Sequence, residues 1–140
     1  MKKTWPLVAA AFLALSISSC EKDDDQKPVT QCIAGLGGDF RMATYAVHNG
    51  DTLLNYEDHP DTAYVKFGTT NFPGTNTSNY DTYFVSEEGE NHIHVEGLKC
   101  GKYVIYRTAY NMPDSTRYQG FLSIEITKNS GELDTAIIVN

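Results

Sequence analysis

The stretch HVEGLKCGKYVIYRTAY, residues 94–110, decides the fold. Gly97 and Gly101 are turn residues, and they lie between two segments, residues 92–96 and 102–110, that are rich in strand-favouring side chains. Alternate residues of an extended chain face opposite ways, so one face of the second segment carries Tyr103, Ile105 and Arg107. The stretch therefore predicts two strands joined by a tight turn.

Turn signals recur at strand-length intervals along the rest of the chain, and no helical period persists. Asn49 and Gly50 form a hairpin-turn signal, because both residue types tolerate a positive φ. Residues 52–56 are expected to return from this turn, and residues 68–81 form a long loop. The expected strands are residues 40–48, 63–67, 82–86, 92–96, 102–110, 120–127 and 133–139. About seven strands without a helix predict an all-β fold, an antiparallel β-sandwich.

The pattern G-L-x-x-G-x-Y over residues 97–103 resembles the strand–turn–strand of prealbumin-like sandwiches, including carboxypeptidase regulatory-like and collagen-adhesin B-type domains. In those domains the Leu closes one end of the core, the second Gly allows a tight turn, and the Tyr begins the next core strand. The resemblance implies these roles for Leu98, Gly101 and Tyr103. Cys100 occupies a position where those domains often have Pro. A shared fold implies no particular ligand.

Residues 1–19 have the parts of a bacterial lipoprotein signal peptide. Lys2 and Lys3 precede an apolar run, residues 5–15, which is shorter than the ~20 residues that span a bilayer. The next residues, SISSC, resemble a lipobox, which implies cleavage before Cys20 and attachment of lipid to its thiol. An ordinary signal peptide followed by an incidental cysteine is the alternative.

This interpretation divides the chain into a signal peptide (1–19), a lipidated cysteine with a flexible acidic tether (20–31) and a sandwich domain (32–140). Residues 21–25, EKDDD, resemble the export signal of Bacteroidota surface lipoproteins. That resemblance implies a lipid anchor in the outer membrane, with exposure at the cell surface left open. The alternative for this acidic run is a solvated linker. The chain also resembles small lipoproteins of that phylum that have no assigned activity.

Short Asp-Thr and Asp-Ser motifs resemble the O-glycosylation motif of exported Bacteroidota proteins. Among these motifs, the loop segment of residues 114–116 makes Ser115 the best candidate, because modification requires exposure.

Two cysteines remain after lipidation. Outside the reducing cytosol, a Cys32–Cys100 disulfide would close a loop of about 69 residues and stabilise the fold by a few kcal/mol. Two separate buried thiols are the alternative.

The formal net charge of -7 argues against a nucleic-acid partner, because phosphate binding needs clustered Lys and Arg. There is no G-x-S-x-G motif, and the glycine-rich residues 35–38 precede Asp39, which would repel phosphate. Hydroxyisourate hydrolases of the prealbumin-like fold end in a Tyr-Arg-Gly-Ser-type tail, whereas this sequence ends in AIIVN. The sequence predicts neither an enzyme nor a cofactor.

His92 and His94 lie two residues apart on an expected strand, so they share one face and supply half of a metal site. Imidazole ligands suit zinc or copper. The candidates that would complete the site are Glu87, Glu88, Glu90, His48 and His59. A solvent-facing strand beside an acidic turn is the alternative.

Nine tyrosines are more than so small a core can bury. Exposed tyrosines recognise glycans or proteins, although tyrosine also simply favours strands. The leading hypothesis is a membrane-anchored, non-enzymatic binding or structural module of the envelope, with a protein or glycan partner. The second hypothesis is a zinc- or copper-binding envelope protein that uses His92 and His94.

Overall fold

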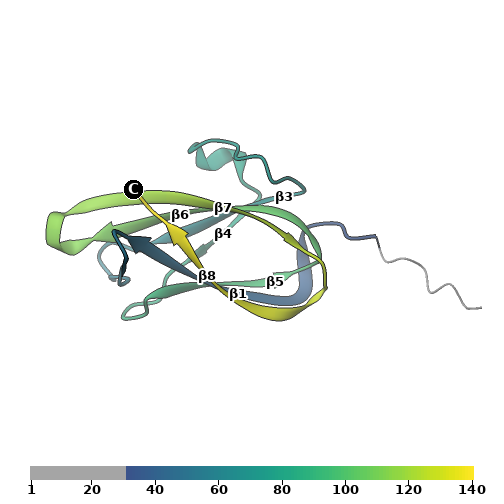
Figure 1. Ribbon diagram of the computed structural model, residues 1–140, viewed down its shortest axis with the longest axis horizontal. Coiled ribbons are helices and arrows are strands. Elements are labelled where there is room, and N and C mark those ends of the chain that lie inside the picture. Colours follow the sequence, from purple (N-terminus) through teal and green to yellow (C-terminus); the bar gives the residue numbers. More distant parts are fainter. Residues whose placement is uncertain (1–30) are drawn as a thin grey trace, which may run out of the picture. The chain divides into compact units, whose positions relative to one another are not determined.

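Two β-sheets face each other in the computed structural model, which describes residues 31–140 (Figure 1). The predicted signal peptide, Cys20 and nearly all of the tether lie outside the described residues. The first sheet contains β1 (Leu36–His48), β2 (Asp51–Thr52), β5 (His92–Leu98) and β8 (Ser130–Ile138). The second sheet has the order β4 (Thr82–Val85), β3 (Thr62–Phe67), β6 (Gly101–Asn111) and β7 (Thr116–Ile126).

The all-β sandwich predicted from the sequence is confirmed, although several strand ends, the return from the Asn49–Gly50 turn and the direction of one strand pair differ from the prediction. The return from the Asn49–Gly50 turn is the two-residue strand β2, where residues 52–56 were expected. One strand pair, β1 with β8, is parallel. Residues 127–129 carry the chain from β7 in one sheet to β8 in the other, so no hairpin imposes an antiparallel direction on β8.

The described residues contain two short 3-10 helices, η1 (Thr77–Asn79) and η2 (Met112–Asp114). Within this part of the chain no helix has the length and apolar character needed to cross a membrane.

The core lies between the sheets and is built from the inward side chains of alternating strands. Leu98 and Tyr103, on either side of the β5–β6 turn, are fully buried. The Tyr103 hydroxyl donates to the Lys99 carbonyl at 2.7 Å, and the Gly35 N–H donates to that hydroxyl at 2.9 Å. A Cβ on Gly101 would lie 2.5 Å from the backbone nitrogen of Ala34, so the turn packs directly on the segment before β1.

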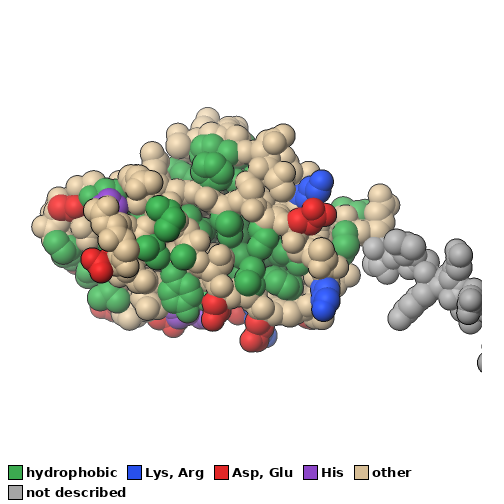
Figure 2. Space-filling view, in the orientation of Figure 1, with side chains coloured by type: hydrophobic (Ala, Val, Ile, Leu, Met, Phe, Trp, Pro, Cys, Tyr) green, Lys and Arg blue, Asp and Glu red, His purple; other side chains and the backbone are tan. Residues whose placement is uncertain are grey.

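Half-buried apolar side chains extend the core where β7 approaches β8. Leu122, Ile124 and Leu133 pack against the buried cluster there. Figure 2 shows hydrophobic side chains gathered across the middle of the view, where β7 and β8 lie in Figure 1.

The predicted Cys32–Cys100 disulfide is present, with its Cα atoms 4.9 Å apart. It joins the segment that precedes β1 to the β5–β6 turn, and it links residues 68 positions apart. The bridge and the Tyr103 hydrogen bonds hold the same two segments together.

A polar cluster lies inside the sandwich, around Arg107, whose side chain is fully buried. Its guanidinium donates to Thr44 Oγ1 at 3.3 Å and to Asn55 Oδ1 at 3.4 Å, and it lies 4.0 Å from Asp61 Oδ2.

Burial raises the pKa of Asp61 to about 6, although the Tyr110 N–H and the nearby arginines act to lower it. Burial also lowers the pKa of Arg107 to about 10, against the effect of Asp61. Two charges that face each other in the core make this cluster sensitive to substitution.

Candidate metal centre

His92 and His94 project from the outer face of β5, as their spacing predicts. Between and beyond them, Ile93 and Val95 point inward and are buried in the core. The two Nε2 atoms lie 3.0 Å apart, and the rings meet edge to face. The strand therefore brings two imidazole nitrogens to one point, which is the first requirement of a metal site.

Glu90, in the turn before β5, supplies a third ligand atom. Its Oε2 lies 3.6 Å from His92 Nε2 and 3.9 Å from His94 Nε2. This oxygen is buried and has no hydrogen-bond partner among the described residues. A buried carboxylate oxygen normally has such a partner, so Oε2 lacks one that a bound cation would supply.

Asn55, in the segment between β2 and β3, holds this turn in place through two hydrogen bonds. Its backbone N–H donates to the Glu90 carbonyl at 2.8 Å, and its side-chain amide donates to the His92 carbonyl at 2.8 Å. Gly89 takes a positive φ of 79° where the turn reverses. Asn55 is almost fully buried, so the position of Glu90 relative to the histidines is fixed by the core and not only by an exposed loop.

His92 is oriented by a further contact on its other nitrogen. Nδ1 lies 3.1 Å from Asn91 Oδ1, so the tautomer with a proton on Nδ1 donates there and leaves Nε2 as an acceptor, 3.0 Å from Nε2 of His94. The ring also packs against Tyr45, with the centroids 5.3 Å apart. Such outer contacts commonly orient metal-binding imidazoles.

The three ligand atoms are spaced as a tetrahedral metal ion requires. Two atoms bound to one zinc ion at about 2.0–2.2 Å lie roughly 3.3–3.6 Å apart. The observed separations of 3.0, 3.6 and 3.9 Å surround that range. Shifts of a few tenths of an ångström would place all three around one ion.

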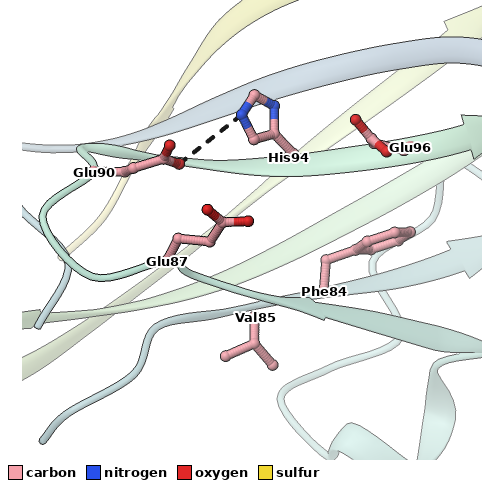
Figure 3. Close-up of a pocket in the computed structure, with 6 residues that line it drawn as sticks. All are labelled: Phe84, Val85, Glu87, Glu90, His94 and Glu96. Atoms are coloured by element: carbon pink, nitrogen blue, oxygen red, sulfur yellow. Dashed lines mark ion pairs between the residues drawn. The ribbon is translucent and has the colours of Figure 1, made fainter. Parts of the chain in front are cut away.

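A hollow of about 270 Å³ opens beside these ligands, between β5 and β4. Figure 3 shows that the Glu90 carboxylate points toward His94, with Glu87 and Glu96 around the same space and Phe84 rising from β4. Three carboxylates on one small hollow favour a cation. With three protein ligands, an ion would keep an open position for water or another molecule.

The other four candidates are not among the three clustered ligands. His48 stacks on Tyr118 at 3.8 Å between centroids, and His59 stacks on Tyr110 at 4.0 Å. Glu87 lines the hollow beside His94 but is not one of the three clustered ligands, and Glu88 lines a different hollow.

Of the five residues that the sequence analysis gave as candidates to complete the site, Glu90 is the one that clusters with His92 and His94. Sequence reasoning did not single out Asn55, whose role depends on contacts far along the chain.

The remaining predicted sites have different outcomes. Ser115 is exposed, in a turn where its φ is 54°, so its hydroxyl is accessible, and its glycosylation stays a prediction. Cys20 lies outside the described residues.

Comparison of the chain with protein-family models, with curated proteins and with solved structures finds no match. The resemblance to prealbumin-like domains and to Bacteroidota lipoproteins therefore stays a prediction.

Proposed function

We propose that this chain is a lipid-anchored, non-enzymatic binding domain of the cell envelope, and that it binds one zinc or copper ion. The observation that carries the proposal is the convergence of Glu90 Oε2, His92 Nε2 and His94 Nε2 at 3.0–3.9 Å from one another. Two imidazoles and one carboxylate form a ligand set that suits either metal.

The lipid anchor is supported by the sequence of residues 1–20, where a basic start, a short apolar run and SISSC follow one another. A tether of about ten residues would keep the domain within ~35 Å of the membrane, since an extended residue spans roughly 3.5 Å. A metal ion bound by the domain would therefore stay close to the membrane.

Calorimetric titration with Zn²⁺ and Cu²⁺ tests the metal site. The protein is the metal-free chain from residue 20 with Cys20→Ala, so that no lipid is attached. We expect submicromolar binding of one ion. Either His92→Ala or His94→Ala should weaken binding by more than about 100-fold. Changing a residue that only hydrogen-bonds to a metal ligand already lowers metal affinity about 10–100-fold, and a lost ligand should cost more. Glu90→Gln, which keeps the shape but removes the charge, should weaken it by at least about 10-fold.

His59→Ala is the matched control, because His59 is a histidine of the same domain outside the cluster. It should bind metal like the unchanged protein. Equal binding by the unchanged protein and by a variant with both His92→Ala and His94→Ala would contradict the proposal.

A further inference from the structure

A row of four aromatic side chains crosses the outer face of the second sheet. The strand register aligns Tyr83 of β4 with Tyr64 of β3, Tyr64 with Tyr106 of β6, and Tyr106 with Phe121 of β7. Aromatic neighbours across strands stabilise a sheet, but a row that spans the whole sheet also presents a continuous aromatic surface.

The loop of residues 68–81 covers only one half of this row. Phe72 stacks on Phe121 with centroids 4.2 Å apart, and Tyr80 stacks on Tyr106 at 5.6 Å. Tyr106 is consequently 4% exposed, whereas Tyr83, at the other end, is 63% exposed. The loop, with η1 at its far end, stands above the second sheet at the top of Figure 1.

The uncovered half forms a groove of about 410 Å³ between the end of this loop and strands β3 and β4. Three tyrosines, Tyr64, Tyr80 and Tyr83, supply its aromatic surfaces. Thr77 and Thr82, which carry hydroxyl groups, also line it. The volume falls in the range of about 300–1,000 Å³ that is typical of small-molecule sites.

The loop side of the groove is held by its own hydrogen bonds. The Tyr80 hydroxyl donates to the Gly74 carbonyl at 2.9 Å, and Asn76 Oδ1 accepts from the Ser78 N–H at 3.1 Å. Asp81 accepts from the Phe67 N–H at 2.7 Å and from Lys66 at 3.0 Å. A groove that is already ordered loses less conformational freedom when a ligand binds.

We propose that this groove binds one pyranose ring of a neutral glycan. A pyranose has an apolar C–H face that packs on tyrosine rings and a rim of hydroxyls that pairs with threonine hydroxyls and carboxylate lone pairs. None of the described lining residues is a lysine or arginine, and the net charge of -7 disfavours anionic sugars. A groove of about 410 Å³ has the size of a small-molecule site, which favours a single sugar ring over a protein partner.

This site is independent of the metal centre. No residue that lines the groove also lines the hollow beside His94. Glycan binding should be the same with and without EDTA, so failure of either proposal leaves the other standing.

The test is an NMR titration of the chain from residue 20, with Cys20→Ala, using cellotriose, maltotriose, xylotriose and tri-N-acetylchitotriose as probes. At least one probe, at up to about 10 mM, should shift the amides of Tyr64 and residues 77–83 with saturation. Tyr83→Ala should weaken that binding at least 10-fold. Tyr56→Ala, a half-buried tyrosine between β2 and β3 that lines neither the groove nor the metal centre, should leave it unchanged.

Tyr83→Leu keeps an apolar side chain but removes the ring, and it serves as a second variant in case Tyr83→Ala disturbs the strand. It should weaken binding as Tyr83→Ala does. No saturable shift at the groove with any of the four probes would overturn the proposal. Binding that Tyr83→Ala and Tyr83→Leu leave intact would overturn it equally.

Discussion

Removal of the Cys32–Cys100 disulfide should lower the free energy of unfolding by about 4 kcal/mol. The bridge links residues 68 positions apart, and the chain-entropy model gives a larger effect for a longer loop. A domain of this size unfolds with only about 5–15 kcal/mol in total, so the loss would be a large part of its stability.

Urea unfolding of the Cys32→Ala, Cys100→Ala double variant, followed by far-UV circular dichroism, measures this loss. The unchanged protein under reducing conditions is the control, and it should match the variant. Equal unfolding midpoints for the oxidised and reduced protein would contradict the expectation. Thiol counting under denaturing, non-reducing conditions should find neither cysteine free.

Arg107→Met should lower the free energy of unfolding by about 3–5 kcal/mol at neutral pH. Methionine fills much of the same apolar volume, so the loss comes mainly from charge. Without the guanidinium, Asp61 stays fully buried and loses the cation that lies 4.0 Å from its Oδ2. Arg117, whose Nη1 is 3.9 Å from Asp61 Oδ1, is the remaining nearby cation and is itself well exposed.

The pH dependence of this loss follows from the raised pKa of Asp61. Because its pKa in the folded protein is about 6, above the ordinary 3.8, the folded state holds the proton more tightly than the unfolded state. The stability that this group contributes is fully present below about pH 4 and is lost as the pH rises through about 6, by up to about 3 kcal/mol. The Arg107→Met loss should therefore shrink at about pH 5, where Asp61 is largely neutral.

Unfolding curves at about pH 5 and 7.5 test this prediction. The double variant Arg107→Met, Asp61→Asn, which has no charge left at either position, should recover much of the stability lost at the higher pH. Arg117→Met removes an exposed arginine near the same carboxylate and serves as the control, with a smaller loss. An Arg107→Met loss of equal size at both pH values would show that the two charges are not coupled.

The strands and their inward faces could be predicted from the sequence because alternation is a local property. Ile93 and Val95 had to face inward if His92 and His94 faced outward, and the structure has this arrangement. Segment ends were less accurate: β7 begins at Thr116 and not at residue 120. Residues 116–119 are mostly polar and exposed, so hydrophobic alternation did not reveal that they pair with the end of β6.

Features that depend on register or on distant contacts could not be predicted. Glu90 was one of five possible partners for the histidine pair, and its selection depends on hydrogen bonds from Asn55 that only the folded turn creates. The aromatic row needs four strands in register, and the parallel β8 needs the chain to change sheets. The alternation of side chains within each segment does not depend on which strand the segment pairs with, so it could not reveal these pairings.

Anomalous X-ray diffraction at the zinc edge, from crystals of the chain grown with Zn²⁺, tests the metal centre most directly. We expect one strong peak bounded by Glu90, His92 and His94, at about 2.0–2.2 Å from Oε2 and from the two Nε2 atoms. The peak should be missing from crystals of the His92→Ala, His94→Ala variant grown in the same way. No peak among these three side chains, or a peak there that survives loss of both histidines, would show that these residues do not form a metal centre.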